Sequence, residues 1–152
     1  MSATIIDSRI FGDMFSDAKM RQVWSDENRT AKYLDIERAL AKVQGELGLI
    51  PREAADEIVK NCNIEQIDWA QLKARTEQIG YPIIAVVNQI NAACRDKLGE
   101  YCHWGATTQD ITDTATIMQV FAADRIRRNL IDCTNPVLLL KYLCHDVSFN
   151  LG

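Results

Sequence analysis

The chain has 152 residues, 47% of them hydrophobic and 25% charged, and this balance excludes a disordered protein because it can fill a core. Its 17 basic and 21 acidic residues give a net charge of −4, so no nucleic acid or anionic membrane is expected as partner. No apolar run approaches the roughly 20 residues of a membrane helix, and the first residues lack the features of a signal peptide. Composition therefore predicts a soluble, cytoplasmic protein.

The first clear helix is predicted from Asp26 to Leu47. Ser25 is a natural N-cap, because its hydroxyl can accept a hydrogen bond from the first turn, and Gly48 is a natural stop. One apolar stripe repeats every three or four residues along this helix and predicts its buried face: Ile36, Leu40, Val43 and Leu47.

Three shorter helices are predicted next, over residues 51–59, 68–80 and 82–98. Pro51 suits the first position of its helix, where its missing N–H is not needed. A capping-box spacing opens the helix over 68–80, and Gly99 is expected to end the last helix. Apolar residues cover most of the circumference of this last helix, which predicts burial nearly all round: Ile83, Ile84, Val86, Val87 and Ile90.

The longest helix is predicted from about Gln109 to at least Ile131, and no convincing strand is found anywhere, so the fold class is all-α. A helix of this length usually belongs to a bundle, and only the helix over 26–47 is comparably long. Its partners are therefore expected in other subunits or in absent sequence. Its apolar face is predicted to consist of Ile111, Ala115, Met118, Phe121, Ile126 and Leu130.

The cysteines and histidines do not form a metal-binding pattern. The five cysteines are odd in number and lack CxxC spacing, and each of the two histidines directly follows a cysteine. We interpret the cysteines as small core residues in a reducing compartment and expect no metal site. Cys102 and His103 resemble a nucleophile pair, but neighbouring side chains rarely point at each other, so no such pair is expected.

The loop before the longest helix could carry chemistry. Thr107 and Thr108 lie where this helix begins, and a helix N-terminus offers unpaired N–H groups and partial positive charge to an anion. Their hydroxyls would grip a carboxylate or phosphate, and His103 would add a hydrogen bond or a charge. Asp110 and Asp113 would then orient the hydroxyls or the loop rather than contact the anion.

A structural interpretation fits the same residues. The spacing from Thr107 to Asp110 is also that of a capping box, with aspartate in place of glutamate. In this interpretation Trp104 is a core residue and His103 a hydrogen-bonded structural group. The residues alone favour the structural cap over the anion site.

Residues 103–115, His-Trp-Gly-Ala-Thr-Thr-Gln-Asp-Ile-Thr-Asp-Thr-Ala, closely resemble the first signature region of the fumarase/aspartase superfamily. The closest resemblance is to 3-carboxy-cis,cis-muconate cycloisomerases and adenylosuccinate-lyase-like enzymes. Supporting blocks at residues 23–27, 34–51 and 80–84 occur in the expected order, so the resemblance covers roughly residues 10 to 132.

This resemblance implies an N-terminal helical domain over residues 1–108, followed over 109–152 by the first helix of a central bundle with an atypical tail. It implies a homotetramer with active sites built from three subunits, and cofactor-free elimination or addition beside a carboxylate of a small-molecule substrate. Thr107 and Thr108 match the hydroxyl pair that binds a substrate carboxylate. His103 matches a position near the substrate, and Asp110 ends the same block, so these four are the candidate substrate-binding residues.

The superfamily's two later signature regions, which carry the catalytic histidine and serine, do not occur in this sequence. We therefore assign no catalytic residue and expect the chain to be truncated and inactive alone. Muconate lactonisation is the favoured activity of the complete enzyme. The alternatives are an adenylosuccinate-lyase-like enzyme, a tricarboxylate lyase or decarboxylase, and a non-catalytic helical module that assembles with a full-length homologue.

Overall fold

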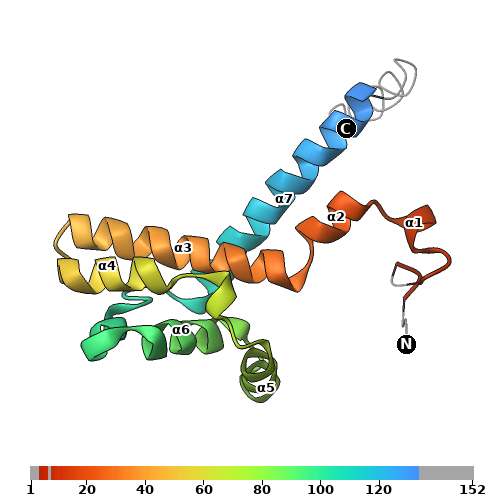
Figure 1. Cartoon of the computed structure of the whole chain (residues 1–152). Coiled ribbons are helices and arrows are strands. Elements are labelled where there is room, and N and C mark those ends of the chain that lie inside the picture. Colours follow the sequence, from red (N-terminus) through yellow and green to blue (C-terminus); the bar gives the residue numbers. More distant parts are fainter. Residues whose placement is uncertain (1–3, 7, 134–152) are drawn as a thin grey trace, which may run out of the picture. The chain divides into compact units, whose positions relative to one another are not determined.

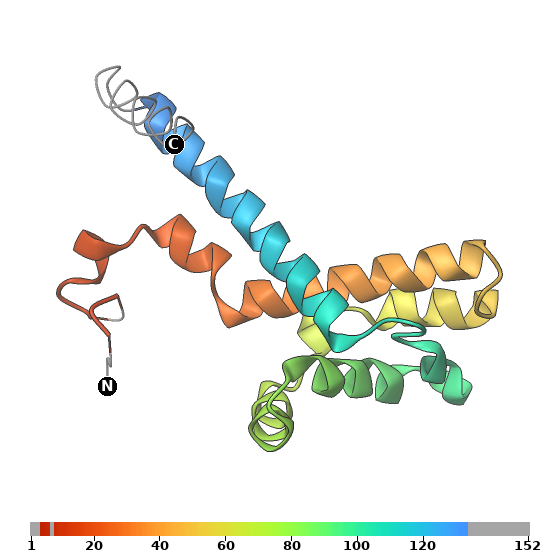
Figure 2. The ribbon, with the colours of Figure 1, turned by 180° about the vertical axis from the view of Figure 1, so that it is seen from behind.

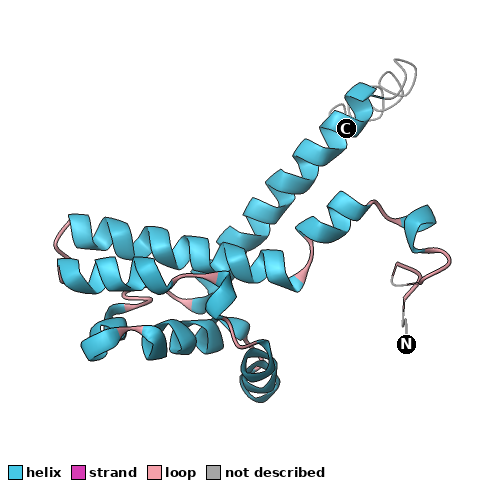
Figure 3. Ribbon diagram, in the orientation of Figure 1, coloured by secondary structure: helices cyan, strands magenta, loops and turns pink. Residues whose placement is uncertain are grey.

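The computed structural model describes residues 4–6 and 8–133, and the side chains of these residues up to 128. Within these ranges every regular element is a helix, so the all-α prediction is confirmed (Figure 3). None of these helices is apolar enough over a sufficient length to cross a membrane. The predicted atypical tail lies outside the described residues.

The described residues form two compact units. One, here called the terminal unit, combines the described parts of Met1–Val23 and Gln119–Gly152; the other, the central unit, is Trp24–Met118. In the terminal unit, the buried Gln119 side chain donates a 2.7 Å hydrogen bond from Nε2 to the Val23 carbonyl. The helices of this unit are α1 (Gly12–Phe15), α2 (Ala18–Val23) and the later part of α7 (Thr108–Cys133).

The central unit is built on a pair of helices, α3 and α4, that lie side by side, with α6 along them in both views (Figures 1 and 2). The predicted cap of α3 is present, because the Ser25 hydroxyl accepts the Asn28 N–H at 3.1 Å. The bounds in this unit are α3 (Asp26–Glu46), α4 (Arg52–Asn61), α5 (Trp69–Ile79) and α6 (Pro82–Ala93), with 3₁₀ helices η1 (Ile64–Gln66) and η2 (Arg95–Tyr101).

Helix α6 ends at Ala93, five residues before the predicted end, so the expected stop at Gly99 is wrong. The chain leaves the helix at Cys94, which is extended and whose N–H is shared between the carbonyls of Ile90 and Asn91. Gly99 instead packs against α6, since a Cβ atom there would lie 2.5 Å from the Asn91 Cα. The glycine allows a close approach of two backbone segments.

The buried face of α3 differs from the predicted stripe. Val43 and Leu47 of that stripe are 50% and 69% exposed. Helices α4 and α6 both contact α3, and α4 comes closest at Gly45, where an added Cβ atom would overlap the Ala55 side chain. The buried residues of α3 are Thr30, Tyr33, Leu34, Glu37 and Ala41.

The core of the central unit draws on every helix from α3 to the start of α7. Helix α6 is not buried all round as predicted, because Ile84 is exposed while Ile83, Val86 and Ile90 are buried. The first two turns of α7 enter the core through Ile111 and Ala115, which thereby hold the N-terminus of that helix in place. Phe121, from the same predicted apolar face, is exposed.

Gly45 should be required where α3 meets α4, because a Cβ atom there would overlap the Cβ of Ala55. We expect Gly45→Ala to lower the free energy of unfolding by about 1–3 kcal/mol, although alanine favours a helix. Replacing Ala55 by glycine in the same chain should recover part of this loss. Urea denaturation of the two single variants and the double variant measures the coupling, and strict additivity would show that the two positions are not in contact.

Candidate functional site

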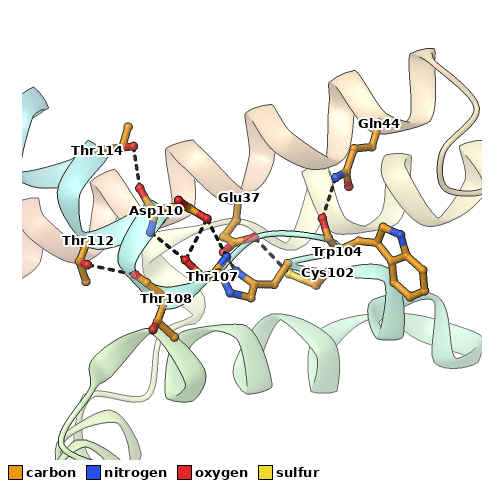
Figure 4. Close-up of polar contacts among 10 residues, drawn as sticks. Glu37, Gln44, Cys102, Trp104, Thr107, Thr108, Asp110, Thr112 and Thr114 are labelled. Carbon is orange, nitrogen blue, oxygen red and sulfur yellow. Dashed lines mark hydrogen bonds and ion pairs between the residues drawn. The ribbon is translucent and has the colours of Figure 1, made fainter.

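The loop over residues 102–107 is fastened to α3 at two points (Figure 4). His103 has a left-handed backbone, with φ of 62°, and its Nδ1 lies 2.6 Å from Oε1 of Glu37. The Gln44 side chain donates from Nε2 to the Trp104 carbonyl at 2.7 Å. A left-handed conformation is costly for a residue with a Cβ atom, so these contacts maintain a defined loop in front of α7.

Helix α7 begins with the capping box that the spacing of Thr107 and Asp110 predicted as the structural alternative. The Asp110 N–H donates to the Thr107 hydroxyl at 3.3 Å, and the Thr107 N–H donates to Asp110 Oδ2 at 2.8 Å. The Thr107 hydroxyl also donates to the same carboxylate oxygen at 2.9 Å. Thr107 is therefore occupied as the N-cap of α7.

Open hydrogen-bond donors follow directly after this cap. Among the described residues, neither the Thr108 hydroxyl nor the N–H groups of Thr108 and Gln109 have a hydrogen-bond partner. The Thr108 carbonyl, by contrast, accepts a 3.0 Å bond from the Thr112 hydroxyl (Figure 4). Three donors at a helix N-terminus suit an anion such as a carboxylate.

Asp110 keeps its negative charge at this helix end. Hydrogen bonds from the backbone and side chain of Thr107 hold the pKa of its carboxyl below the usual value, and a positive charge on His103 would act in the same direction. Asp110 thus orients Thr107, as expected if it supports the turn, and its charge would repel an anion. The structure brings the four predicted residues together at one helix end but ties two of them to each other.

Glu37 is the buried acid of the site, with 1% of the residue exposed. Burial raises the pKa of its carboxyl, while the hydrogen bonds to His103 and Cys102 act the other way. Cys102 Sγ lies 3.9 Å from Glu37 Oε2. Both Cys102 and His103 therefore face this carboxylate.

The cysteine thiols of the site region are inert. Burial and the neighbouring Glu37 carboxylate raise the pKa of the Cys102 thiol, and burial raises the pKa of the Cys62 thiol to about 12. Both thiols stay protonated at neutral pH, so neither is an activated nucleophile. Within the described part of the chain, no group of three or more His, Cys, Asp or Glu side chains could hold a metal ion.

A hollow of about 440 Å³ lies in the central unit and includes Thr112 of the second turn of α7 in its lining. Burial raises the pKa of the Tyr33 hydroxyl in its wall, although the Arg29 guanidinium beside it acts the other way. Acidic and basic residues both line the hollow, so its charge does not select an anion. The charged lining residues are Asp26, Arg29, Lys73 and Glu77.

Sequence reasoning missed the two α3 residues that hold the loop, Glu37 and Gln44. A signal for Glu37 existed, because it lies three residues after Leu34 and four before Ala41, on the face that is buried. An acid at such a position needs a partner. Trp104, which the structural interpretation placed in the core, is exposed and lies with its ring 5.9 Å from that of Tyr101.

Loss of the Thr107 cap should reduce stability. We expect Thr107→Ala to lower the free energy of unfolding by about 1 kcal/mol, because the alanine cannot accept the Asp110 N–H. Thr107→Ser, which keeps the hydroxyl, should retain most of the stability. Thermal denaturation of the three chains checks this, and equal stability of all three would contradict the capping role.

Comparison with known proteins gives a consistent set of relatives, although no model of a protein family matches the chain. Trans-aconitate decarboxylase 1 of Mycosarcoma maydis is 61% identical over 108 residues, covering 71% of this chain and 22% of that protein. Adenylosuccinate lyase of Methanocaldococcus jannaschii is 35% identical over 138 residues, covering 91% of this chain and 30% of the lyase. The crystal structure of β-carboxy-cis,cis-muconate cycloisomerase from Acinetobacter calcoaceticus sp. ADP1 matches with a TM-score of 0.76 and 32% identity, over 82% of this chain and 30% of that one.

The chain thus spans less than a third of the length of each of these proteins. The fold and the sequence both match the N-terminal region of lyases of the fumarase/aspartase superfamily, as the motif at residues 103–115 implied. Of the activities considered from the sequence, the comparisons support the alternatives, an adenylosuccinate-lyase-like enzyme or a tricarboxylate lyase or decarboxylase, better than the cycloisomerase.

Proposed function

We propose that this chain, which corresponds to the N-terminal region of a fumarase/aspartase-superfamily lyase, binds a carboxylate of a tricarboxylate substrate in an enzyme of the decarboxylase type. The observation that carries this proposal is the 61% identity to a trans-aconitate decarboxylase. It is well above the 35% and 32% identities to the adenylosuccinate lyase and the muconate cycloisomerase.

Lactonisation of carboxymuconate remains the second candidate. The observation that favours it is the match to the solved cycloisomerase, with a TM-score of 0.76 over 82% of this chain. Both substrates carry three carboxylates, so a carboxylate site at the start of α7 serves either reaction. The two activities are therefore distinguished by which substrate the enzyme converts.

In the proposed decarboxylation, a carbon–carbon bond to one carboxylate breaks and carbon dioxide leaves. The electron pair left on carbon spreads through the adjacent double bond toward a remaining carboxylate, and a proton then adds to carbon. This chemistry needs no cofactor. It does need hydrogen-bond donors at the carboxylate that takes up the negative charge.

The open donors at the start of α7 fit that requirement. The Thr108 hydroxyl and the N–H groups of Thr108 and Gln109 would bind the charged carboxylate, while Thr107 and Asp110 keep the turn in shape. The Nε2 atom of His103, the ring nitrogen that does not face Glu37, would also meet the substrate carboxylate. We place the proton-transfer groups outside this chain, so the chain supplies binding rather than acid–base chemistry.

The test is an assay of the native protein, recovered from its source cells with an antibody against residues 26–50. We expect release of carbon dioxide from trans-aconitate and little turnover of 3-carboxy-cis,cis-muconate or adenylosuccinate. Preferential turnover of carboxymuconate would replace the decarboxylase with the second candidate. An inactive native protein of 17.2 kDa would contradict both and favour the non-catalytic helical module.

Thr108 should matter for ligand affinity and Thr107 for stability. We expect Thr108→Ala to weaken binding of tricarballylate, a saturated tricarboxylate, about 10- to 100-fold, because a hydrogen bond to a charged group is worth roughly 1.5–3 kcal/mol. Thr108→Ser keeps the hydroxyl and is the matched control. Titration of the ¹⁵N-labelled wild-type chain and of each variant with tricarballylate measures the dissociation constants. An unchanged affinity of Thr108→Ala would remove Thr108 from the site.

A further inference from the structure

Glu37 is an unusual group for the core of a helical unit. It is 1% exposed, yet no lysine or arginine among the described residues forms an ion pair with it. In the described part of the chain, its two carboxylate oxygens contact His103 and Cys102. Burying a carboxylate with a single strong partner costs desolvation free energy. We therefore ask what Glu37 does for His103.

The partner is held in a defined orientation. The His103 Nδ1 lies 2.6 Å from Glu37 Oε1, only 13% of the His103 side chain is exposed, and its backbone is left-handed. The next residue is tied to α3 as well, through the bond from Gln44 to the Trp104 carbonyl. Since Nδ1 is taken up by Glu37, Nε2 is the nitrogen that remains for another group.

We propose that Glu37 is the positioning residue of His103: it keeps a proton on Nδ1 and leaves Nε2, unprotonated in the free chain, to meet the substrate carboxylate. The last part rests on the proposed function. A carboxylate accepts the Nδ1–H bond, and this fixes both the tautomer and the ring orientation. A bound carboxylate at Nε2 would favour uptake of a second proton there, because the imidazolium then lies between two anions.

The other ionisable groups around the pair do not compete for this role. Cys102 and Cys62 are thiols that burial keeps neutral, and Asp110 is held by Thr107. Asp110 is nevertheless close enough to His103 that a positive charge on the imidazole would lower the pKa of the Asp110 carboxyl. His103 therefore connects the buried acid on α3 with the N-terminus of α7.

The tautomer can be read directly by NMR. Long-range ¹H–¹⁵N spectra of the uniformly labelled chain at pH 8 contain only two imidazoles, His103 and His145, and a His103→Gln variant assigns them. We expect His103 to carry its proton on Nδ1 and to show the pyridine-like ¹⁵N shift at Nε2. The opposite pattern in the wild-type chain would overturn the proposal.

Two variants of similar size distinguish the hydrogen-bond acceptor at position 37 from its negative charge. Glu37→Gln retains an oxygen that accepts the Nδ1–H bond, so the tautomer should persist. Glu37→Met has no strong acceptor, so His103 should change to mainly the Nε2–H form, which free imidazole prefers in water. If the methionine variant keeps the proton on Nδ1, Glu37 does not position the ring.

Titration with tricarballylate distinguishes this proposal from the proposed function. In the wild-type chain we expect the His103 Nε2 signal to move to its protonated position as tricarballylate binds, together with the amide signals of Thr108 and Gln109. The Nδ1–H tautomer without any response to tricarballylate would support the Glu37 contact and overturn the carboxylate site. A response of the amides with a silent His103 would support the site and overturn the role of Nε2.

Discussion

Truncation of Leu34 to alanine is expected to lower the free energy of unfolding by about 2–5 kcal/mol. Leu34 is 2% exposed and lies in the face of α3 that belongs to the core of the central unit. Removing its branched end would lose buried apolar area and leave a cavity among well-packed neighbours. Urea or guanidinium denaturation of the purified chain measures the loss.

Leu47 provides the matched control, because it lies near the end of the same helix and is 69% exposed. Leu47→Ala should change the free energy of unfolding by less than about 0.5 kcal/mol. The stripe predicted from the sequence, Ile36 to Leu47, would give the reverse order of the two effects. A large loss at Leu47 with a small one at Leu34 would therefore contradict the packing of α3.

The contrast between these two leucines shows which features of the fold can be predicted from the sequence. The ends of α3 and α5 depend on local bonds, such as the one from the Asn28 N–H to Ser25, and they lie where capping residues predicted. The buried face of α3 depends on what packs against it. Apolar spacing alone selected the wrong face, because the buried face of α3 includes Glu37 and the small Ala41, and α4 approaches α3 closely at Gly45.

The candidate site was predictable to a similar extent. The spacing from Thr107 to Asp110 predicts a capping box, which the structure contains, and the motif at residues 103–115 indicated the superfamily. The partner of His103 could not be predicted from spacing, since Glu37 lies 66 residues away along the chain. Contacts at such separations follow from the packing of whole helices, which local sequence does not reveal.

The stability of the chain should depend on pH through Glu37 in the opposite sense to an ordinary salt-bridged acid. Burial raises the pKa of Glu37 above its usual value of 4.5, so in the window between these two values the folded state binds more protons than the unfolded state. The free energy of unfolding therefore falls as pH rises through this window. The contribution approaches at most about 1.4 kcal/mol per pH unit and is constant below and above the window.

Comparison with Glu37→Gln isolates this contribution, because the amide does not titrate. We expect the difference in unfolding free energy, wild type minus variant, to be constant below about pH 4 and to decrease as pH rises above the ordinary glutamate pKa. Hydrogen bonds lower the pKa values of Asp110 and Asp124, so these two residues make the chain more stable as pH rises. Both are present in the wild type and in the variant, so their contributions cancel in the difference. Urea denaturation from pH 3 to pH 8 measures the difference. An increase with rising pH would instead mean that His103 stabilises the charged carboxylate by more than burial destabilises it.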